Sequence, residues 1–408
     1  MPERSRPVLE VEEARDRILS TVSILEEEMV PTLDAVFRVL TEPITADRDV
    51  PPATNAAMDG YAIRAEDATD VPVRLTLIGD VAAGHMPDRT VGPGEAMRIM
   101  TGAPVPSGAD TVVRFERTRE HEGQVEILKS PSHGKNVRQA GEDVREGETV
   151  LQAGTVLRPQ EIGMLSALGK LNVQVYRRPR VAILATGDEV VPPHQTPGPG
   201  QIRDANSYTV AAQVQAYGGI PMMLGVAHDR EELVRQGVRD ALEREADLIV
   251  TTGGVSVGDF DLVKQILAAE GEMHFWSLNM KPGRPMAFGV VNGVPLLGLP
   301  GNPVATMISM ELFGRPAMLK MQGFTDWWRP VVRARLQTPI ERKDNRRHYL
   351  RVQLHETPAG LEASLTGDQG SGILNSLLLA DGLAVIPEDA NRLPAGSEVD
   401  VLLLPRTL

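Results

Sequence analysis

The region from about residue 180 to 322 alternates short apolar runs with amphipathic segments, and this alternation constrains the fold more than any other feature of the chain. The apolar runs have the length of buried strands, and the amphipathic segments have the length and spacing of helices. Such alternation predicts a doubly wound α/β domain with a parallel sheet, which binds ligands at the carboxyl ends of its strands. Asn206 could cap the first helix. The expected strands are 181–185, 220–226, 248–251 and 295–299, and the expected helices are 207–217, 231–244, 261–270 and 304–321.

The chain changes character on the N-terminal side of this region. Residues 8–40 carry acidic and apolar residues at helical spacing, which predicts a helical lead-in. From residue 46 to about 146, short β-type runs such as 73–79 alternate with Gly/Pro turns, which predicts an inserted β domain. Residues 159–168 return to helical spacing, with Pro159 where a first helical turn accepts proline. The apolar face of the lead-in consists of Val11, Ala14, Ile18, Val22 and Leu25.

A β pattern also returns after residue 328. Alternating apolar and polar residues over 331–336, 349–354 and 398–404 predict strands, and Pro/Gly turns separate them. We therefore expect an α/β multidomain protein. Its expected parts are a helical and mixed linker domain (1–45 and 147–177), an inserted β domain (46–146), the α/β domain (178–327) and a small C-terminal β domain (328–408).

Composition limits what this architecture can do. The formal net charge of -13 argues against a nucleic-acid-binding protein, which needs a basic excess to neutralise phosphates. No apolar run approaches the roughly 18 residues that cross a bilayer, and the N-terminus lacks the apolar core of a signal peptide, so we expect a cytoplasmic protein without a membrane partner. The chain has no cysteine, so a soft metal would need its sulfur ligands from a cofactor.

A glycine-rich turn follows the third expected strand, at residues 253–259. Its glycines let the backbone approach a ligand closely, its N–H groups can bind an anion, and Asp259 stands where the next helix begins and could hold Mg²⁺. The turn has neither the Gly-Lys-Ser/Thr ending of a P-loop nor the G-x-G-x-x-G spacing of a dinucleotide site. It indicates a nucleotide or phosphorylated cofactor, with a tight turn that binds nothing as the alternative.

Three further loops follow expected strands or lie close to them. Asp188 and Glu189 could hold a divalent ion, although paired acids are also common at a helix start. Lys281 and Arg284 stand three residues apart in a proline-containing turn, which suits an oxyanion or a pyrophosphate; the alternative is a solvated basic loop. Asn302 stands where it could cap the last helix, whose free N–H groups could bind an anion.

Local rules identify fewer candidates outside the α/β domain. Asp59 before Gly60 is an ordinary turn pair, and Thr101 before Gly102 is typical of turns and of ligand loops alike. Basic residues at 342–347 are typical of a solvated face. Arg351 lies in a strand pattern instead of the loop, so it is the best directional anion ligand of that domain.

Seven motifs, taken in order, resemble those of the molybdenum insertase family, which comprises the bacterial MoeA proteins and the matching domain of gephyrin. The resemblance spans nearly the whole chain. It implies a MogA-like molybdopterin-binding α/β domain, a C-terminal β-barrel and an elongated homodimer whose active site lies between subunits. The motifs lie at 55–62, 100–106, 136–143, 186–189, 253–259, 280–285 and 298–303.

The resemblance also implies a reaction. The family binds adenylylated molybdopterin and molybdate, cleaves the pyrophosphate linkage with Mg²⁺, releases AMP and leaves molybdenum on the pterin dithiolene, which supplies the sulfur that this chain lacks. A molybdopterin adenylyltransferase and molybdoenzyme maturation proteins are the implied partners besides the second subunit. Two alternatives stay open, a molybdopterin adenylyltransferase, whose fold the 180–322 segment resembles, and a gephyrin-like scaffold without catalysis.

Residue roles carry over from the resemblance by matching motifs. Arg284 departs from the family, since many relatives have Lys there, and His228-Asp229 replaces what is often a pair of acids. The implied catalytic residues are Asp59, Thr101, Asp188, Glu189, Asp259 and Lys281, and the implied metal ligands are Asp259, Asp229 and Glu189. The implied cofactor-binding residues are Gly253, Gly254, Ser256, Lys281, Arg284, Pro300, Gly301, Asn302, Arg351 and Ser371.

Overall fold

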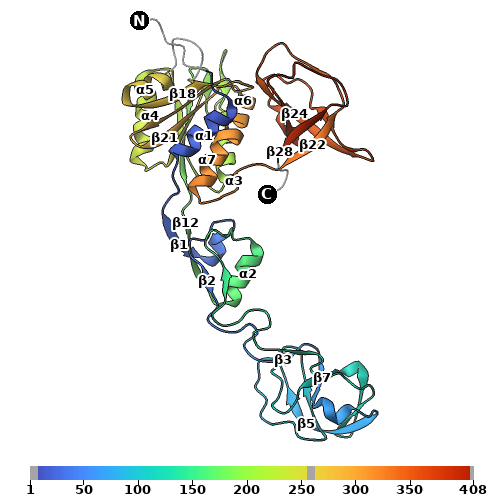
Figure 1. Cartoon of the computed structure of the whole chain (residues 1–408). Helices are drawn as coiled ribbons and strands as arrows, with labels where there is room; N and C mark the ends of the chain where they lie inside the picture. The colour runs from blue at the N-terminus through green and yellow to red at the C-terminus, as the bar shows by residue number, and fades with distance from the viewer. Residues whose placement is uncertain (1–7, 255–261, 405–408) are drawn as a thin grey trace. The chain divides into compact units, whose positions relative to one another are not determined.

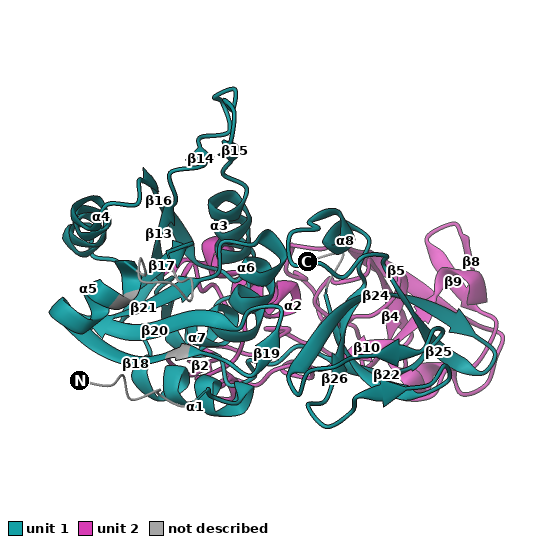
Figure 2. Cartoon of the chain, turned by 90° about the horizontal axis from the view of Figure 1, so that it is seen from above, with its two compact units in different colours: residues 1–29, 37–39, 174–408 teal, residues 30–36, 40–173 magenta. Residues whose placement is uncertain are grey.

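The computed structural model of the chain describes residues 8–254 and 262–404 (Figure 1). The chain divides into two compact units, coloured separately in Figure 2. Unit 1 consists of Met1–Met29, Phe37–Val39 and Gln174–Leu408, and unit 2 consists of Val30–Val36 and Leu40–Val173. Strands β1 (Glu27–Pro31) and β12 (Asn172–Tyr176) each span a boundary between the units. The four-part division drawn from the sequence stays a prediction.

Unit 1 contains the expected α/β domain, built on a six-stranded sheet with the order β16-β13-β17-β21-β20-β18. The first four strands are parallel, as predicted. The last two are antiparallel, so the sheet is mixed, and both of these strands were missing from the sequence prediction. The strands are β13 (Arg180–Thr186), β16 (Ile220–Ala227), β17 (Leu248–Thr252), β18 (Gly271–Ser277), β20 (Pro285–Val291) and β21 (Val294–Leu299).

Helices cover both faces of this sheet, as a doubly wound fold requires (Figure 1). Neighbouring residues of β13 face opposite ways: Val181 and Ile183 pack with α1, α3, α6 and α7, whereas Ala182 packs with α4 and α5. Short strands β14 (Val190–Val191) and β15 (Ile202–Arg203) extend from the domain (Figure 2). The helices are α1 (Val11–Thr21), α3 (Asn206–Ala216), α4 (Glu231–Glu243), α5 (Leu262–Glu270), α6 (Pro303–Ser309) and α7 (Arg315–Met321).

Two helical predictions need correction. The lead-in helix α1 ends at Thr21 instead of continuing toward residue 40, because β-branched residues follow it and Pro31 cannot continue a helix. Its apolar face is as expected, and Val11, Ala14 and Ile18 are buried in the core of unit 1. The single helix expected over 304–321 is interrupted by a π turn, Met310–Gly314, between α6 and α7.

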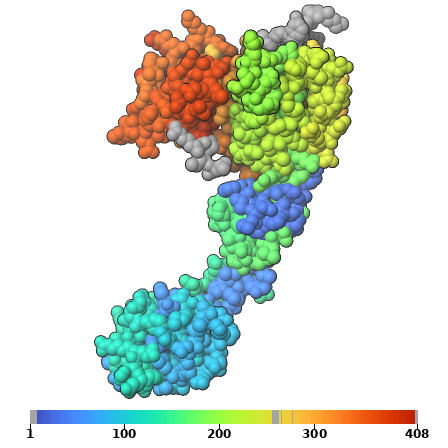
Figure 3. Space-filling view, turned by 180° about the vertical axis from the view of Figure 1, so that it is seen from behind, coloured from blue at the N-terminus to red at the C-terminus, as the bar shows by residue number. Residues whose placement is uncertain are grey.

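The C-terminal part of unit 1 is a closed β-barrel, as predicted. Five strands pair in the order β24-β25-β22-β28-β26, and β26 pairs again with β24 to close the ring. The barrel lies against the α/β domain (Figure 3), and Tyr349, Leu377 and Leu383 belong to the α/β core. The elements are β22 (Val331–Leu336), β23 (Ile340–Glu341), β24 (Arg347–Thr357), β25 (Gly360–Leu365), α8 (Asn375–Leu378), β26 (Gly382–Ile386), β27 (Arg392–Leu393) and β28 (Glu398–Leu403).

A short strand joins the two parts of unit 1 at the predicted basic loop. Strand β19 (Met280–Lys281) pairs in parallel with β24, so that Lys281 lies opposite His348. Lys281 of the α/β domain is therefore held beside the first residues of β24.

A buried carboxylate fixes the segment that leads into the barrel. Glu311, in the π turn, is 7% exposed and accepts hydrogen bonds from the Tyr217 hydroxyl (2.7 Å) and from Nε of Arg329 (2.6 Å). Nε of Arg315 lies 3.8 Å from the same carboxylate. Burial and the nearby Glu311 charge raise the pKa of Tyr217 well above its usual value. Arg329 stands two residues before β22, the first strand of the barrel. This cluster therefore connects α3 and the π turn to the segment that enters the barrel.

Unit 2 is built around the expected β insert. Its six-stranded sheet has the order β7-β4-β6-β5-β9-β8, with a hydrophobic cluster on each face. No helix of the described residues in either unit is long and apolar enough to cross a membrane. The main elements are β4 (Gly60–Ile63), β5 (Val73–Val81), β6 (Glu95–Ile99), β7 (Thr111–Arg114), β8 (Thr118–His121), β9 (Gln124–Ile127) and α2 (Pro159–Ala167), and the short pairs are β2 (Ile44–Thr45) with β11 (Thr149–Leu151) and β3 (Asn55–Ala56) with β10 (Val137–Arg138).

Candidate functional site

A cavity of about 600 Å³ lies at the carboxyl ends of β13, β17 and β21, the position where a doubly wound sheet binds its ligand. We call it the strand-end cavity. Its wall combines glycine-rich backbone with carboxylate and amide side chains. The residues that contribute to it include Thr186, Glu189, Asp204, Asn206, Asp229, Thr252, Gly253, Gly254, Pro300, Gly301 and Asn302.

Two glycines of the predicted phosphate turn are required by close backbone packing. Gly253 and Gly254 have φ values of 93° and 66°, and a Cβ on Gly253 would lie 2.7 Å from the carbonyl oxygen of Thr186. The N–H of Gly253 donates to the carbonyl oxygen of Leu299 (3.0 Å), so this group serves the fold and is not free to bind an anion. Both glycines border the cavity. The rest of the turn, including Ser256 and Asp259, lies outside the described residues.

The predicted acids lie close together in space at this end of the sheet. Glu189 and Asp229 both border the strand-end cavity. Asp188 is exposed, and its Oδ1 accepts a hydrogen bond from the backbone N–H of Asp229 (3.1 Å) and lies 3.3 Å from Nδ1 of His228. No group of three or more acidic or histidine side chains within the described residues forms a ready metal site.

Helix starts around the cavity differ from the predicted capping. Asn206 does not cap α3, because Oδ1 of Asp204 accepts the bond from the Ser207 N–H (2.9 Å). The amide of Asn206 instead donates to the carbonyl oxygen of Gly301 (2.7 Å). Asn302 occupies the N-cap position of α6, but its side chain makes no capping bond. This side chain borders the cavity instead, where it can serve a ligand.

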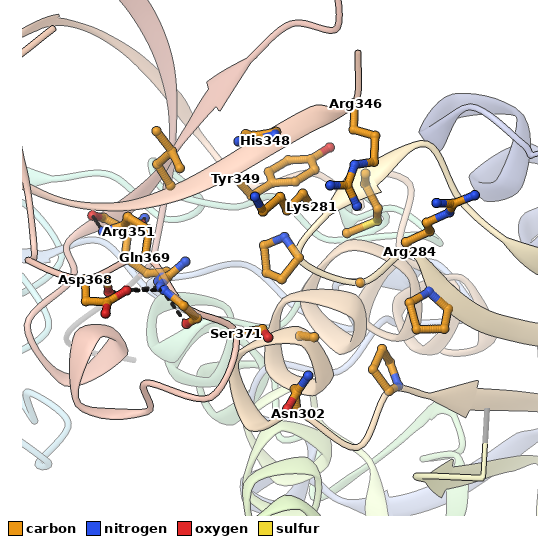
Figure 4. A pocket seen from close by; sticks show the side chains of 18 residues that line it. Lys281, Arg284, Asn302, Arg346, His348, Tyr349, Arg351, Asp368, Gln369 and Ser371 are labelled. Atoms are coloured by element: carbon orange, nitrogen blue, oxygen red, sulfur yellow. Dashed lines mark hydrogen bonds between the residues drawn. The ribbon is translucent and has the colours of Figure 1, made fainter. Parts of the chain in front are cut away.

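A second cavity, of about 590 Å³, is lined by positive side chains (Figure 4). We call it the basic cavity. Loops of the α/β domain form one wall, and β24 and the 368–371 loop of the barrel form the other. The polar side chains around it are those of Lys281, Arg284, Asn302, Arg346, His348, Arg351, Asp368, Gln369 and Ser371. Four cations against one carboxylate in this wall make the cavity suited to an oxyanion.

Arg351 is the most constrained of these cations, since it is fully buried in β24. Its Nε donates to Oγ of Ser376 (3.0 Å), and its Nη2 donates to the carbonyl oxygens of Gly370 (3.0 Å) and Asp368 (3.3 Å). Burial lowers the pKa of the guanidinium from its usual value. Nη1 is buried and has no partner within the described part of the chain. Arg351 thus holds the 368–371 loop and keeps one donor for a ligand.

Replacing Arg351 with lysine is expected to lower the free energy of unfolding of unit 1 by about 1–3 kcal/mol. The ammonium has three N–H donors on a single nitrogen, whereas Arg351 reaches Ser376 from Nε and the carbonyl oxygens of Asp368 and Gly370 from Nη2. Denaturant unfolding measures this change. Arg333→Lys is the matched control, since Arg333 is an exposed residue of β22 that pairs with Asp400 on the barrel surface (2.9 Å). Equal losses in the two variants would contradict the structural role of Arg351.

Lys281 and Arg284 occupy opposite ends of one turn and are both exposed, so they are available to a ligand. Gly283 between them has a φ of 105°, and a Cβ there would lie 2.9 Å from Oγ of Ser309. The turn can therefore pack this closely on α6 only with glycine at 283. This packing fixes the direction in which both cations project.

The barrel loop and the start of α6 are also joined. The N–H of Val304 donates to the carbonyl oxygen of Ser371 (3.1 Å), which places Ser371 beside Pro300 and Asn302. Pro285, Pro300 and Asn302 border both cavities, so the two cavities adjoin. The structure thus brings together all the predicted cofactor-binding residues that it describes.

Asp59 and Thr101 lie in unit 2 and contact each other. Oδ1 of Asp59 accepts hydrogen bonds from the backbone N–H (2.7 Å) and the hydroxyl (2.8 Å) of Thr101. These bonds lower the pKa of Asp59, so this exposed carboxylate is ionised and pre-oriented. Two turns that local rules treated separately form one polar unit.

Sequence reasoning missed several residues of the basic cavity. Arg346 was assigned to a solvated face and His348 was not considered, whereas Asp368 and Gln369 were placed in a loop that resembles the family's C-terminal site loop but were given no role. Arg346 and His348 flank the start of a strand that also carries Arg351, and this shared strand was the available signal. Asp368 and Gln369 directly precede Ser371 in the chain, so the loop could have been taken as a whole.

The fold and the two cavities define a class of multidomain proteins with a ligand cavity at the strand ends of an α/β domain, beside a second cavity lined by cations. A family model described as "Probable molybdopterin binding domain" matches residues 182–320. A model for the MoeA N-terminal region, domains I and II, matches residues 9–169, and a model for the MoeA C-terminal region, domain IV, matches residues 333–404.

Relatives identify the family itself. A molybdopterin molybdenumtransferase of a Nostoc species is 38% identical over 390 residues, covering 93% of this chain and 89% of the relative. Molybdopterin molybdenumtransferase 2 of Mycobacterium tuberculosis is 37% identical, covering 91% of this chain and 94% of the relative. The crystal structure of the molybdopterin biosynthesis MoeA protein of Pyrococcus horikoshii superposes with a TM-score of 0.83 at 34% identity, covering 97% of this chain and 99% of that one. The chain belongs to the MoeA family of molybdopterin molybdenumtransferases.

Proposed function

We propose that this transferase inserts molybdate into adenylylated molybdopterin, with release of AMP, at the two adjoining cavities of unit 1. The observation that carries the proposal is the basic cavity, which Lys281, Arg284 and buried Arg351 all border and which adjoins the strand-end cavity; Nη1 of Arg351 has no partner within the described residues. An adenylylated pterin has a nucleotide at one end, a pyrophosphate in the middle and a dithiolene at the other. Two cavities in series suit such a molecule.

The residues of this chain bind and stabilise charge instead of attacking the substrate. Gly253, Gly254 and Asn302 would hold the nucleotide side, where backbone and amide groups border the strand-end cavity. Lys281 and Arg284 would neutralise the pyrophosphate or molybdate, helped by Arg351 and Ser371. An oxygen of water, or of molybdate with later hydrolysis by water, would attack the AMP phosphorus, and the bridging P–O bond would break to separate AMP from the pterin monophosphate. The two dithiolene sulfurs would then replace oxygen ligands of molybdate, which leave as water with the thiol protons. The chain has no cysteine, which agrees with the pterin supplying both sulfur ligands of molybdenum.

Carboxylates at the strand-end cavity fit a role in holding Mg²⁺. Glu189 and Asp229 offer oxygen ligands at its wall, and Mg²⁺ commonly takes one or two carboxylates with waters and substrate phosphates as its other ligands. When bound, the ion would offset negative charge on the pyrophosphate. Asp259 would be a further ligand, on the basis of its sequence motif.

A homodimer with a shared active site is also part of the proposal. Asp59 and Thr101 form a polar unit in unit 2, whereas both cavities lie in unit 1. The family resemblance implies that the Asp59 unit of one subunit completes the cavities of its partner.

Subunit mixing tests this sharing. Asp59→Ala and Lys281→Gln are each expected to be inactive as homodimers, and denaturing and refolding them together is expected to restore about a quarter of wild-type AMP release. The reason is that half of the randomly assorted dimers are mixed and carry one intact site of two. Activity that stays at the level of the separate variants would contradict a shared site.

One assay tests the function. Purified protein receives adenylylated molybdopterin, Mg²⁺ and molybdate, and AMP and molybdenum-loaded pterin are measured together. Equal amounts of both products are expected. Adenylylation of molybdopterin by ATP without molybdate would instead identify an adenylyltransferase. Retention of the nucleotide without AMP release would identify a binding protein or scaffold.

A further inference from the structure

A carboxylate stands directly behind the cations of the basic cavity. Asp344, in the loop between β23 and β24, accepts a hydrogen bond from Nη2 of Arg346 to Oδ2 (2.5 Å). Its Oδ1 lies 2.6 Å from Nε2 of His348. Nζ of Lys281 lies 3.9 Å from Oδ2. Lys281, Arg346 and His348 all border the cavity, on the same side of it (Figure 4).

We propose that Asp344 is an internal counter-anion of the basic cavity, which offsets the charge of Lys281 and Arg346 and so weakens the binding of oxyanions. The proposal rests on the function proposed above and adds a residue that sets how tightly the site holds its anion. Three contacts distinguish Asp344 from a surface acid, since each of its partners belongs to the cavity wall.

Asp344 makes close contacts with Arg346 and His348 and a longer contact with Lys281. Arg346 and His348 hold the Asp344 carboxylate through short contacts, and His348 is buried. Lys281 is half exposed, and 3.9 Å is too long for a hydrogen bond. The ammonium of Lys281 is thus kept near the cavity without being bound, and it can turn to an incoming anion at little cost.

Asp344 carries its negative charge under all working conditions. Burial would raise the pKa of Asp344, but the hydrogen bonds from Arg346 and His348 outweigh it and bring the pKa to about 2. Burial lowers the pKa of His348 in spite of the neighbouring carboxylate, so this ring is mostly neutral at pH 7. The wall of the cavity itself contains one carboxylate within the described residues, that of Asp368, whose Oδ1 accepts the N–H of Gly370.

A fixed negative charge has a use in this site. Four cations in one cavity would hold a dianion tightly, and a tightly held anion leaves slowly. A carboxylate among them reduces the affinity for substrate and product anions alike, because like charges repel. Removing this carboxylate should strengthen the binding of an oxyanion, which is the opposite of what the loss of a supporting residue would do.

The test is calorimetric titration of molybdate into the full-length protein and into Asp344→Asn at constant ionic strength. Asparagine keeps one oxygen acceptor, for Arg346, and its amide N–H can donate to Nε2 of a neutral His348, whereas the charge is removed. We expect molybdate to bind about three- to tenfold more tightly to D344N. Asp400→Asn is the matched control, because it removes one carboxylate from an exposed part of the barrel that does not border the cavity, and its affinity should equal that of the wild type.

Each outcome decides the proposal. Equal or weaker molybdate binding by folded D344N overturns it, because Asp344 would then only position its neighbours. Asp344→Ser is tested in parallel, so that a folding defect of one variant does not leave the question open; it should show the same gain. In turnover, D344N should lower KM for molybdate without raising kcat. If the wild type binds no molybdate, or if Lys281→Gln binds it unchanged, the function proposed for the cavity fails first.

Discussion

Replacing Lys281 with glutamine is expected to lower kcat/KM for molybdate-dependent AMP release by about 100-fold or more. Lys281 is a half-exposed cation at the basic cavity, held there by the pairing of β19 with β24. Under the proposed function, charge that develops on the transferring phosphorus and its oxygens loses one compensating cation in this variant, and removal of one such donor typically costs this much. The loss should appear in kcat as well as in KM, because the charge grows during the reaction.

Lys343→Gln is the matched control for this experiment. Lys343 is an exposed lysine of the 341–347 loop and does not border the cavity, so the same change in net charge should alter the rate by no more than about twofold. Steady-state assays with adenylylated molybdopterin measure both variants. If Lys281→Gln and Lys343→Gln behave alike, the cavity is not where the chemistry occurs.

Replacing Glu311 with alanine is expected to destabilise unit 1 by about 3–5 kcal/mol. The buried Glu311 carboxylate neutralises Arg329 and accepts the Tyr217 hydroxyl, and Arg315 lies beside it. Without it, two largely buried guanidinium groups face each other with no counter-charge. Denaturant unfolding followed by a probe in unit 1, such as the fluorescence of its tryptophans, measures the change.

Glu341→Ala provides the comparison, since Glu341 also pairs with an arginine, Arg392, but on an exposed part of the barrel. Its replacement should cost less than about 1 kcal/mol. A small loss in Glu311→Ala would show that the cluster contributes little to the attachment of the barrel. Because the barrel forms one wall of the basic cavity, we also expect Glu311→Ala to weaken molybdate binding, whereas Glu341→Ala should not.

The sequence predicts the parallel half of the sheet well, because buried parallel strands form continuous apolar runs. The antiparallel strands β18 and β20 were missed, although β20 and β21 are joined by Asn292-Gly293, the residue pair most typical of a two-residue hairpin turn. Both residues adopt the positive φ that such a turn requires. The π turn within the last helix has no comparable signal, since it depends on the packing of Glu311 against distant side chains.

Some residues of the site can be identified from local sequence patterns, and others can be identified only from the tertiary structure. Local chemistry near strand ends identifies Lys281, Arg284 and Glu189 as candidates, with a solvated loop or an ordinary helix start as the alternative. The connection of Asp59 to Thr101, and the contact of Asp344 with Arg346, His348 and Lys281, join residues through the tertiary structure. Motif resemblance supplied Asp59 and Thr101, because local rules see only two ordinary turns. Nothing in the sequence alone points to Asp344.

The wall shared by the two cavities has a consequence for substrate choice. Lys281 does not border the strand-end cavity and Gly253 does not border the basic cavity, so under the proposed function a nucleotide alone would not reach Lys281 and a free oxyanion would not touch Gly253. Only a molecule that runs past Pro285, Pro300 and Asn302 engages both. We expect this wall to select substrates by length. Free nucleotides would be too short to occupy both cavities and would not be hydrolysed, whereas adenylylated molybdopterin would occupy both and be cleaved.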